Sequence, residues 1–213
     1  MKYLSTSILG FKENSKENIK KIDSLNTDYL HIDIMDGIFV PNKTWSIEET
    51  KTLVENHTKP LDVHLMVSDI KKYIDDFSTL NPTYITFHFE ATENPKEIIE
   101  YVKSKNIKVG ISIKPRTTVE DLIPYLNLVD LILIMSVEPG KGGQEYLTSA
   151  NEKIDELELL RNAYKYNYFI EVDGGINNNT IKECLNADMF VVGSYITSSE
   201  DFEEKINEIK SNF

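Results

Sequence analysis

Residues 29–37 read Tyr-Leu-His-Ile-Asp-Ile-Met-Asp-Gly. If residues 29–34 form a strand, the side chains alternate between two faces, so His31 and Asp33 share one face while the apolar residues point to the other. One strand end then presents an imidazole and a carboxylate side by side, a pair that suits a borderline divalent metal ion. By itself the stretch also fits a polar strand end that stops at an Asp-Gly turn, so its interpretation depends on the rest of the chain.

Apolar runs of strand length recur along the whole chain, and helical patterns or loops separate them. Ser46 and Ser68 are the expected N-caps of two of the helices, and another helix is expected to carry Ile181 and Leu185. The expected strands cover residues 3–9, 29–34, 61–66, 84–89, 108–113, 131–135, 168–172 and 189–192.

Eight such units without an obvious antiparallel hairpin imply parallel strands with crossover helices. They predict an α/β fold in one domain over residues 1–213, a closed (β/α)8 TIM barrel. An open doubly wound sheet is the alternative. The first strand is not followed by Gly-x-Gly-x-x-Gly, which counts against a dinucleotide-binding version of that sheet.

Composition narrows the possible partners. The formal charge of −12 argues against nucleic acid and anionic membranes, because both select basic surfaces. With Arg116 and Arg161 as the only arginines, a phosphate group would be held mainly by backbone N–H groups. The one cysteine, Cys184, predicts a reducing compartment. Because no apolar run approaches the roughly 20 residues of a membrane helix and residues 1–10 do not resemble a signal peptide, we expect a soluble cytoplasmic protein.

Polar side chains gather where the expected strands end, which is where barrel enzymes carry their active sites. Two histidines and two aspartates among them can hold a divalent cation and leave positions open for substrate oxygens. A buried hydrogen-bond network of the same groups is the alternative, but four such groups gathered without a cation would be costly. The polar residues at strand ends are Ser7, His31, Asp33, His64, His88, Glu90 and Asp173, of which His31, Asp33, His64 and Asp173 are the candidate metal ligands.

The two aspartates also suggest a reaction. Asp33 and Asp173 come from strands that lie far apart around the barrel, so they can face each other across a bound substrate. Inversion at a carbon atom requires this arrangement, because one carboxylate removes a proton from one face and the other returns a proton to the opposite face.

Glycine-bearing loops follow the last three expected strands. The loops after strands seven and eight form the usual phosphate site of this fold, where exposed N–H groups meet an oxyanion. Methionines at three strand ends would fill the core or form an apolar wall that keeps water from a reactive intermediate. The loop residues are Gly140, Gly142, Gly143, Gly174, Gly175, Gly193 and Ser194, and the methionines are Met35, Met66 and Met135.

Five motifs, in order over nearly the whole chain, resemble those of the ribulose-phosphate 3-epimerases. They are His31-Ile-Asp33-Ile-Met35-Asp36-Gly37-x-Phe39-Val40-Pro41-Asn42, His64-Leu-Met66, Phe87-His88-Phe-Glu90-Ala91, Met135-Ser-Val-Glu-Pro139-Gly140-x-Gly142-Gly143-Gln144 and Glu171-Val-Asp173-Gly174-Gly175. The resemblance implies a barrel of the ribulose-phosphate-binding type that interconverts D-ribulose 5-phosphate and D-xylulose 5-phosphate in the pentose phosphate pathway.

The resemblance also implies roles for individual residues. Asp33 and Asp173 would exchange the proton at C3 through a cis-enediolate, with one divalent ion (zinc, iron, manganese or cobalt) and no organic cofactor. Met35, Met66 and Met135 match the family's methionine wall, and a homo-oligomer is implied. The implied metal ligands are His31, Asp33, His64 and Asp173, and the implied substrate contacts are Ser7, His64, Gly140, Lys141, Gly142, Gly143, Asp173, Gly174, Gly175, Gly193 and Ser194.

The chain departs from the family pattern in three loops. Residues 10–12 read Gly-Phe-Lys, residues 43–46 read Lys-Thr-Trp-Ser, and Lys141 stands at a position that is commonly aromatic. Such changes can alter the sugar length accepted, loop closure or turnover. The alternatives are therefore a D-allulose 6-phosphate 3-epimerase and a catalytically silent sugar-phosphate-binding barrel.

Overall fold

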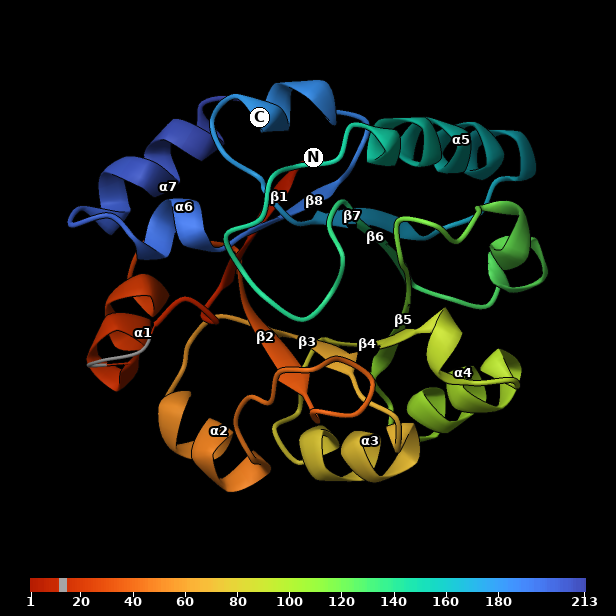
Figure 1. The fold of residues 1–213 in the computed structure, drawn as a ribbon, viewed down its shortest axis with the longest axis horizontal. Coiled ribbons are helices and arrows are strands. Elements are labelled where there is room, and N and C mark those ends of the chain that lie inside the picture. Colours follow the sequence, from red (N-terminus) through yellow and green to blue (C-terminus); the bar gives the residue numbers. More distant parts are fainter. Residues whose placement is uncertain (12–14) are drawn as a thin grey trace.

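A computed structural model describes residues 1–11 and 15–213, so Lys12 of the first departing loop lies outside the described residues. Each strand pairs in parallel with the next along the chain, and the last pairs with the first, which closes a barrel. Figure 1 looks into this ring of strands. The TIM-barrel prediction is confirmed, and the open doubly wound sheet is excluded. The strands are β1 (Tyr3–Ser7), β2 (Tyr29–Met35), β3 (Leu61–Met66), β4 (Tyr84–His88), β5 (Lys108–Ile113), β6 (Leu131–Met135), β7 (Phe169–Asp173) and β8 (Met189–Val192).

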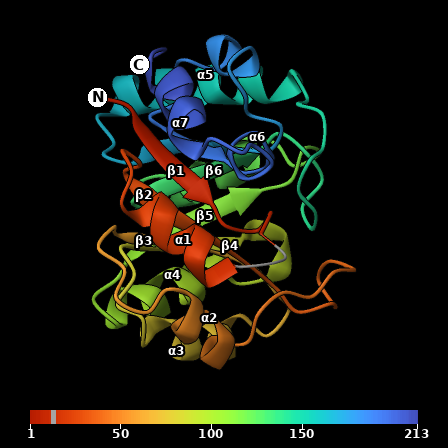
Figure 2. The ribbon, with the colours of Figure 1, turned by 90° about the vertical axis from the view of Figure 1, so that its left-hand side faces the viewer.

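Helices surround the barrel in Figures 1 and 2. Ser46 caps its helix as expected, in a capping box with Glu49. The α-helices are α1 (Ser15–Asp23), α2 (Ile47–Leu53), α3 (Ile70–Ser78), α4 (Pro95–Ser104), α5 (Ser149–Tyr164), α6 (Ser194–Thr197) and α7 (Phe202–Lys210), and the 3-10 helices are η1 (Phe89–Ala91), η2 (Glu120–Tyr125) and η3 (Thr180–Glu183).

Two predictions about helices were wrong. Asp69, not Ser68, caps α3: its carboxylate accepts from the Lys72 N–H, and the Ser68 N–H donates to the Asp36 carboxylate. The helix expected to carry Ile181 and Leu185 is only η3, which ends before Leu185. The short helix α6, which directly follows β8, was not expected.

The strand pattern sorts side chains between two cores. On β2, Leu30, Ile32 and Ile34 are fully buried under the outer helices, while His31 and Asp33 point into the barrel. The amino-terminal end of the barrel interior is apolar, with Tyr84, Leu131 and Met189. Above it the interior becomes polar, with Ser5, His31, Asp62, Thr86, Ser112 and Glu171 all buried.

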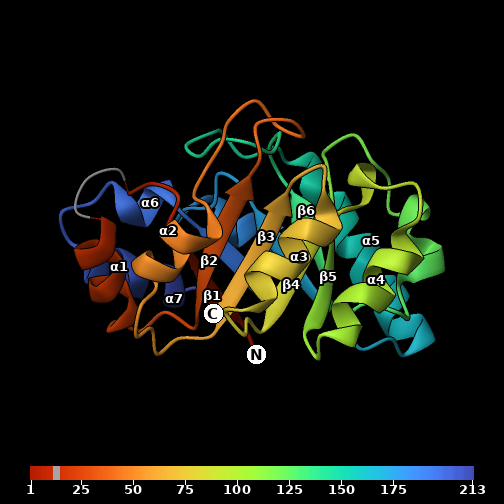
Figure 3. The same cartoon turned by 90° about the horizontal axis from the view of Figure 1, so that it is seen from below.

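Two long loops rise together over the carboxyl ends of the strands. Figure 3 shows the β2–α2 loop and the β6–α5 loop on this side of the molecule. The Asn42 side-chain amide donates to the Gly140 carbonyl at 2.8 Å and joins them. Within the described residues, we find no helix long and apolar enough to cross a membrane.

Candidate active site

Four side chains from three strands meet at the carboxyl end of the barrel. His31 and Asp33 come from β2, His64 from β3 and Asp173 from β7, and one ligand atom of each lies within 4.8 Å of the other three. Asp33 Oδ1 is 3.2 Å from His31 Nε2 and 3.1 Å from His64 Nδ1. With zinc–ligand bonds of about 2.0–2.2 Å, neighbouring ligand atoms stand about 3–3.5 Å apart, so the donor set fits a divalent cation.

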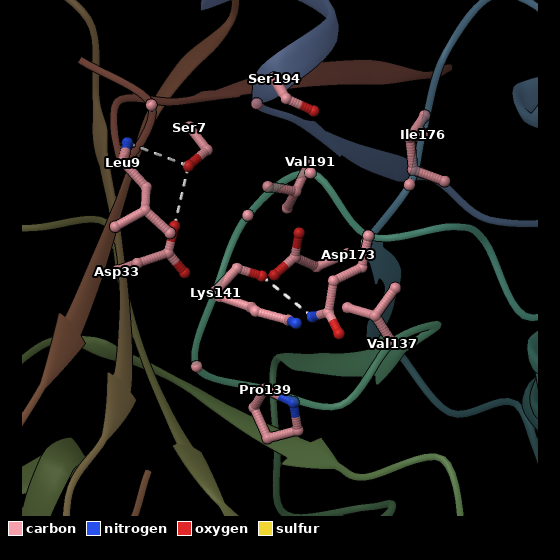
Figure 4. Close-up of a pocket in the computed structure, with 18 of the residues that line it drawn as sticks. Ser7, Leu9, Asp33, Val137, Pro139, Lys141, Asp173, Ile176, Val191 and Ser194 are labelled. Carbon is pink, nitrogen blue, oxygen red and sulfur yellow. Dashed lines mark hydrogen bonds between the residues drawn. The ribbon is translucent and has the colours of Figure 1, made fainter. Parts of the chain in front are cut away.

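Asp33 is the most firmly held of the four. Ser7 Oγ donates to Asp33 Oδ2 at 2.8 Å, as Figure 4 shows. Burial opposes ionisation of this carboxyl, but the charges and hydrogen bonds of His31 and His64 outweigh burial and lower the pKa of Asp33 far below its usual value. Asp33 is therefore ionised.

Asp173 has the opposite electrostatic environment. Burial, and then the negative charge of Asp33, raise the pKa of Asp173 to about 6. His64 Nδ1 is 3.9 Å from Asp173 Oδ2, too far for a hydrogen bond. The two carboxyls thus differ in proton affinity although they share one site, which is the pattern of an acid paired with a base.

We predict that zinc affinity falls as the pH drops below about 6. Above this pH Asp173 is ionised and available as a ligand, whereas below it a proton must leave before the metal binds, which costs about tenfold in affinity per pH unit. Because the folded-state pKa is raised, ionised Asp173 also destabilises the metal-free protein above pH 6. Chelator competition between about pH 5 and pH 8 measures the effect, and a slope that does not steepen below pH 6 contradicts it. Asp173→Asn is the control that should lose this extra slope and keep the one from His31, whose pKa, in spite of burial, the charges of Asp33 and Asp62 raise well above its usual value.

A second group of buried carboxyls lies directly beneath the four residues. His31 Nδ1 is 2.6 Å from Asp62 Oδ2, which also accepts from Ser5 Oγ at 2.9 Å. Burial, and then the charge of Asp62, raise the pKa of Glu171 well above its usual range, so Glu171 is neutral. We did not predict these two residues, although each lies two positions before a candidate ligand on the same strand and therefore on the same face.

His88 and Glu90 continue the site outward from His64. His88 Nε2 lies 2.9 Å from His64 Nε2, and His88 Nδ1 lies 3.3 Å from Glu90 Oε2. Burial lowers the pKa of His88 to about 4, so its ring is neutral. Burial also opposes the ionisation of Glu90, but hydrogen bonds from His88, Thr117 and Lys114 lower its pKa to about 2. Sequence reasoning placed both residues near the site without assigning them a role.

A cavity of about 300 Å³ opens above Asp33 and Asp173. In Figure 4 the loop that carries Lys141 crosses in front of it. All the residues that the sequence assigned to substrate contact line this cavity except His64, which lies buried beside Asp33. The lining includes Ser7, Gly140, Lys141, Gly142, Gly143, Gly174, Gly175, Gly193 and Ser194, together with Met35, Met66 and Met135.

Backbone geometry explains why glycine stands at two positions of the β7 loop. Gly174 and Gly175 have φ angles of +117° and +62°, which L side chains rarely adopt. A Cβ at Gly175 would lie 2.5 Å from the Tyr146 backbone nitrogen, so the β7 loop packs tightly on the β6–α5 loop. Arg161 contributes nothing here, because it pairs with Asp188 before β8, at the other end of the barrel.

Comparisons with known proteins agree with this geometry. Residues 3–197 match the model of the "Ribulose-phosphate 3 epimerase family". The ribulose-phosphate 3-epimerase of Helicobacter pylori strain J99 is 40% identical over 185 residues, covering 85% of each chain. That of Schizosaccharomyces pombe is 33% identical over 210 residues, covering 96% of this chain and 90% of the relative.

Solved structures at low identity share the fold. KGPDC from Streptococcus mutans matches with a TM-score of 0.71 at 13% identity, over 100% of this chain and 97% of the other. Phosphoribosyl anthranilate isomerase from Thermococcus kodakaraensis matches with a TM-score of 0.66 at 14% identity, over 100% and 98%. From its family match and its curated relatives, this chain belongs to the ribulose-phosphate 3-epimerase family.

Proposed function

We propose that this enzyme interconverts D-ribulose 5-phosphate and D-xylulose 5-phosphate. The observation that carries the proposal is the pair Asp33 and Asp173, two carboxyls of different proton affinity that reach one cavity from β2 and β7. Epimerisation at C3 needs one group to remove a proton and a second to supply one from the other face. The family match supports the same reaction.

In the proposed mechanism the proton at C3 is acidic because the neighbouring C2 carbonyl can accept the negative charge. Ionised Asp33 removes the proton in one direction, and Asp173 delivers its replacement to the opposite face of the cis-enediolate. In the reverse direction the two roles exchange. A divalent cation held by His31, Asp33, His64 and Asp173 would supply a Lewis acid that stabilises negative charge on the sugar oxygens.

The rest of the cavity suits the rest of the substrate. We propose that backbone N–H groups around Gly174, Gly175, Gly193 and Ser194 hold the phosphate, since Arg161 lies elsewhere. The side chains of Met35, Met66 and Met135 are almost completely buried and line the cavity. In the proposal this apolar wall keeps water away from the cis-enediolate.

The first experiment measures turnover of metal-loaded protein on D-ribulose 5-phosphate and D-allulose 6-phosphate side by side. At least a tenfold preference for the pentose in kcat/KM, about 1.4 kcal/mol, is expected. A preference for the hexose would keep the two-carboxylate chemistry and reassign the substrate, with Trp45 and Lys141 as the first residues to exchange. Failure of solvent deuterium to enter C3 of either sugar would instead leave a silent sugar-phosphate-binding barrel.

Lys141→Ala should weaken substrate binding more than chemistry. Lys141 lines the cavity from an exposed loop, so its charge attracts the substrate without contacting Asp33 or Asp173 in the structure. We expect KM to rise about three- to tenfold with kcat within about twofold, which corresponds to about 0.7–1.4 kcal/mol of uniform binding. Lys51→Ala, on the exposed side of α2, is the charge-matched control. Unchanged KM and kcat would exclude any role for Lys141.

Two further parts of the proposal concern the assembly and the metal. The homo-oligomer and the cytoplasmic location stay predictions, and sedimentation velocity tests the first. Mixed nitrogen and oxygen ligands accept zinc, iron, manganese or cobalt, and metal analysis of the protein purified from its native host would identify the ion used.

A further inference from the structure

The two ring nitrogens of His64 have different neighbours. Nδ1 faces Asp33 Oδ1 at 3.1 Å, whereas Nε2 lies 2.9 Å from His88 Nε2. Two imidazole nitrogens at this distance share a single hydrogen, so one nitrogen donates and the other is bare. Both rings are fully buried, so water does not replace this contact. The direction of the His64–His88 hydrogen bond therefore decides which nitrogen of His64 is free to bind a cation.

Glu90 sets that direction. Its Oε1 accepts from the Lys114 backbone N–H at 2.7 Å and from the Thr117 hydroxyl. Its Oε2 then faces His88 Nδ1 at 3.3 Å as a carboxylate oxygen, which can only accept. His88 consequently carries its hydrogen on Nδ1 and leaves Nε2 bare. The bare Nε2 accepts from His64 Nε2–H, so in the neutral His64 ring Nδ1 is the nitrogen without a hydrogen, and it can bind a cation in place of its hydrogen bond to Asp33.

We propose that His88 and Glu90 are positioning residues that hold His64 in the tautomer whose Nδ1 binds the divalent cation. This inference rests on the proposed metal-dependent function and adds two residues to it. A hydrogen-bond partner on the far nitrogen of a ligand imidazole orients the ring and raises its basicity. His31 has a comparable partner in Asp62, which contacts Nδ1 at 2.6 Å and leaves Nε2 for the cluster.

The hydrogen-bond chain from His64 through His88 ends at Glu90, which the loop of residues 114–117 after β5 holds in place. Lys153 of α5 donates to the carbonyls of Lys114, Pro115 and Thr117, at 3.1, 2.8 and 2.6 Å. The loop that presents the Lys114 N–H to Glu90 is thereby held in place. The Phe39 ring packs on His88 with ring centroids 4.9 Å apart. The direction of the hydrogen bonds from Glu90 through His88 to His64 is therefore set by the Lys114 backbone N–H, which can only donate.

Glu90→Gln tests the proposal with almost no change in shape. Its carbonyl oxygen must stay on the Lys114 N–H, so its NH2 group turns toward His88 Nδ1 and the direction of every following bond reverses. His64 would then carry its hydrogen on Nδ1. We expect zinc affinity, measured by chelator competition, to fall about tenfold to hundredfold. In the zinc-loaded wild-type protein, ¹⁵N spectra of the His64 ring should report a hydrogen on Nε2 only.

Two variants separate this effect from loosened packing. Thr117→Val removes one anchor of Glu90 without changing the polarity of the chain, so zinc affinity should change less than about threefold. His88→Gln can rotate its amide to offer an oxygen to His64 whatever faces it from position 90. In the His88→Gln protein, adding Glu90→Gln should lower zinc affinity by less than about threefold. A purely structural role of Glu90 would not produce this non-additivity.

The outcomes are distinct. Any one of four results would overturn the proposal. Glu90→Gln could keep wild-type zinc affinity, Thr117→Val could lose as much affinity as Glu90→Gln, or the losses could be additive in the double variant. The fourth is a hydrogen on His64 Nδ1 in the zinc-loaded protein. If the zinc measurements agree with it but neither sugar phosphate turns over, the proposed reaction fails while the assignment of His88 and Glu90 stands. If the wild-type protein turns over sugar without binding metal, the assignment fails and the reaction stands.

Discussion

Asp173→Asn should lower epimerase kcat/KM by at least about a thousandfold while the protein stays folded. The change keeps the volume of the side chain, but it removes the carboxyl that the proposed mechanism uses to deliver a proton and that belongs to the candidate metal ligands. General acid–base catalysis alone contributes about a hundredfold to ten-thousandfold, and loss of a candidate metal ligand adds to that. Steady-state turnover at saturating zinc, with circular dichroism of the same sample, measures the effect.

Isotope exchange separates proton transfer from metal loss in this variant. Asp33 remains, so the metal-loaded Asp173→Asn protein should still exchange the C3 proton of one epimer with solvent deuterium more readily than that of the other. Asp121→Asn, on the exposed helix η2, is the matched control and should keep full activity. More than about a tenth of wild-type activity at full metal content would remove Asp173 from the mechanism.

Gly175→Ala should lower kcat/KM at least about a hundredfold, mainly through KM. The residue has a φ of +62°, and the new Cβ would meet the Tyr146 nitrogen at 2.5 Å and the Gln144 carbonyl oxygen at 2.9 Å. Because these are backbone atoms, the β7 loop or the β6–α5 loop must shift and the proposed phosphate seat is distorted. Strain and clash together should reduce the free energy of unfolding by about 2–4 kcal/mol. Thermal unfolding and the phosphate dependence of inhibition measure the two effects.

Gly143→Ala is the control for this prediction. Gly143 also has a positive φ, +72°, but nothing lies within 4 Å of its Cβ position. It therefore carries the strain without the clash, and a loss of about 1 kcal/mol in the free energy of unfolding is expected. Equal losses in both variants would mean that the backbone conformation matters and the close packing on Tyr146 does not.

The arrangement of the barrel could be predicted because its signals are local. The two-residue period of residues 29–35 places His31 and Asp33 on one face whatever the rest of the chain does. Repeated strand–helix alternation then brings the strand ends to one rim, which is enough to assemble His31, Asp33, His64 and Asp173. The N-cap at Ser46 is equally local, and this prediction is confirmed; the structure adds a capping box with Glu49.

Features that depend on tertiary contacts could not be predicted in the same way. Ser68 is a residue type that often caps helices, but α3 begins one residue later with Asp69 as its cap, and the Ser68 N–H donates to Asp36, a residue of a different loop. Glu90 stands in a 3-10 turn after β4, and its orientation depends on the backbone of residues 114–117. The burial of Asp62 and Glu171 follows from strand alternation, and Asp62 meets His31 as its register partner on the neighbouring strand β3. The approach of Glu171 depends on how β7 lies across the barrel.

If the proposed cation binds, the carboxyls stacked in the barrel centre make the lifetime of the protein depend on the supply of metal. Asp62 and Glu171 are fully buried beside each other, and Asp33 and Asp173 lie above them. A cation bound only to the folded chain at about a hundred times its Kd adds about 2.7 kcal/mol to the free energy of unfolding. Cells short of the metal would therefore hold less of this protein as well as less activity, because the metal-free barrel unfolds more often and exposes itself to proteases.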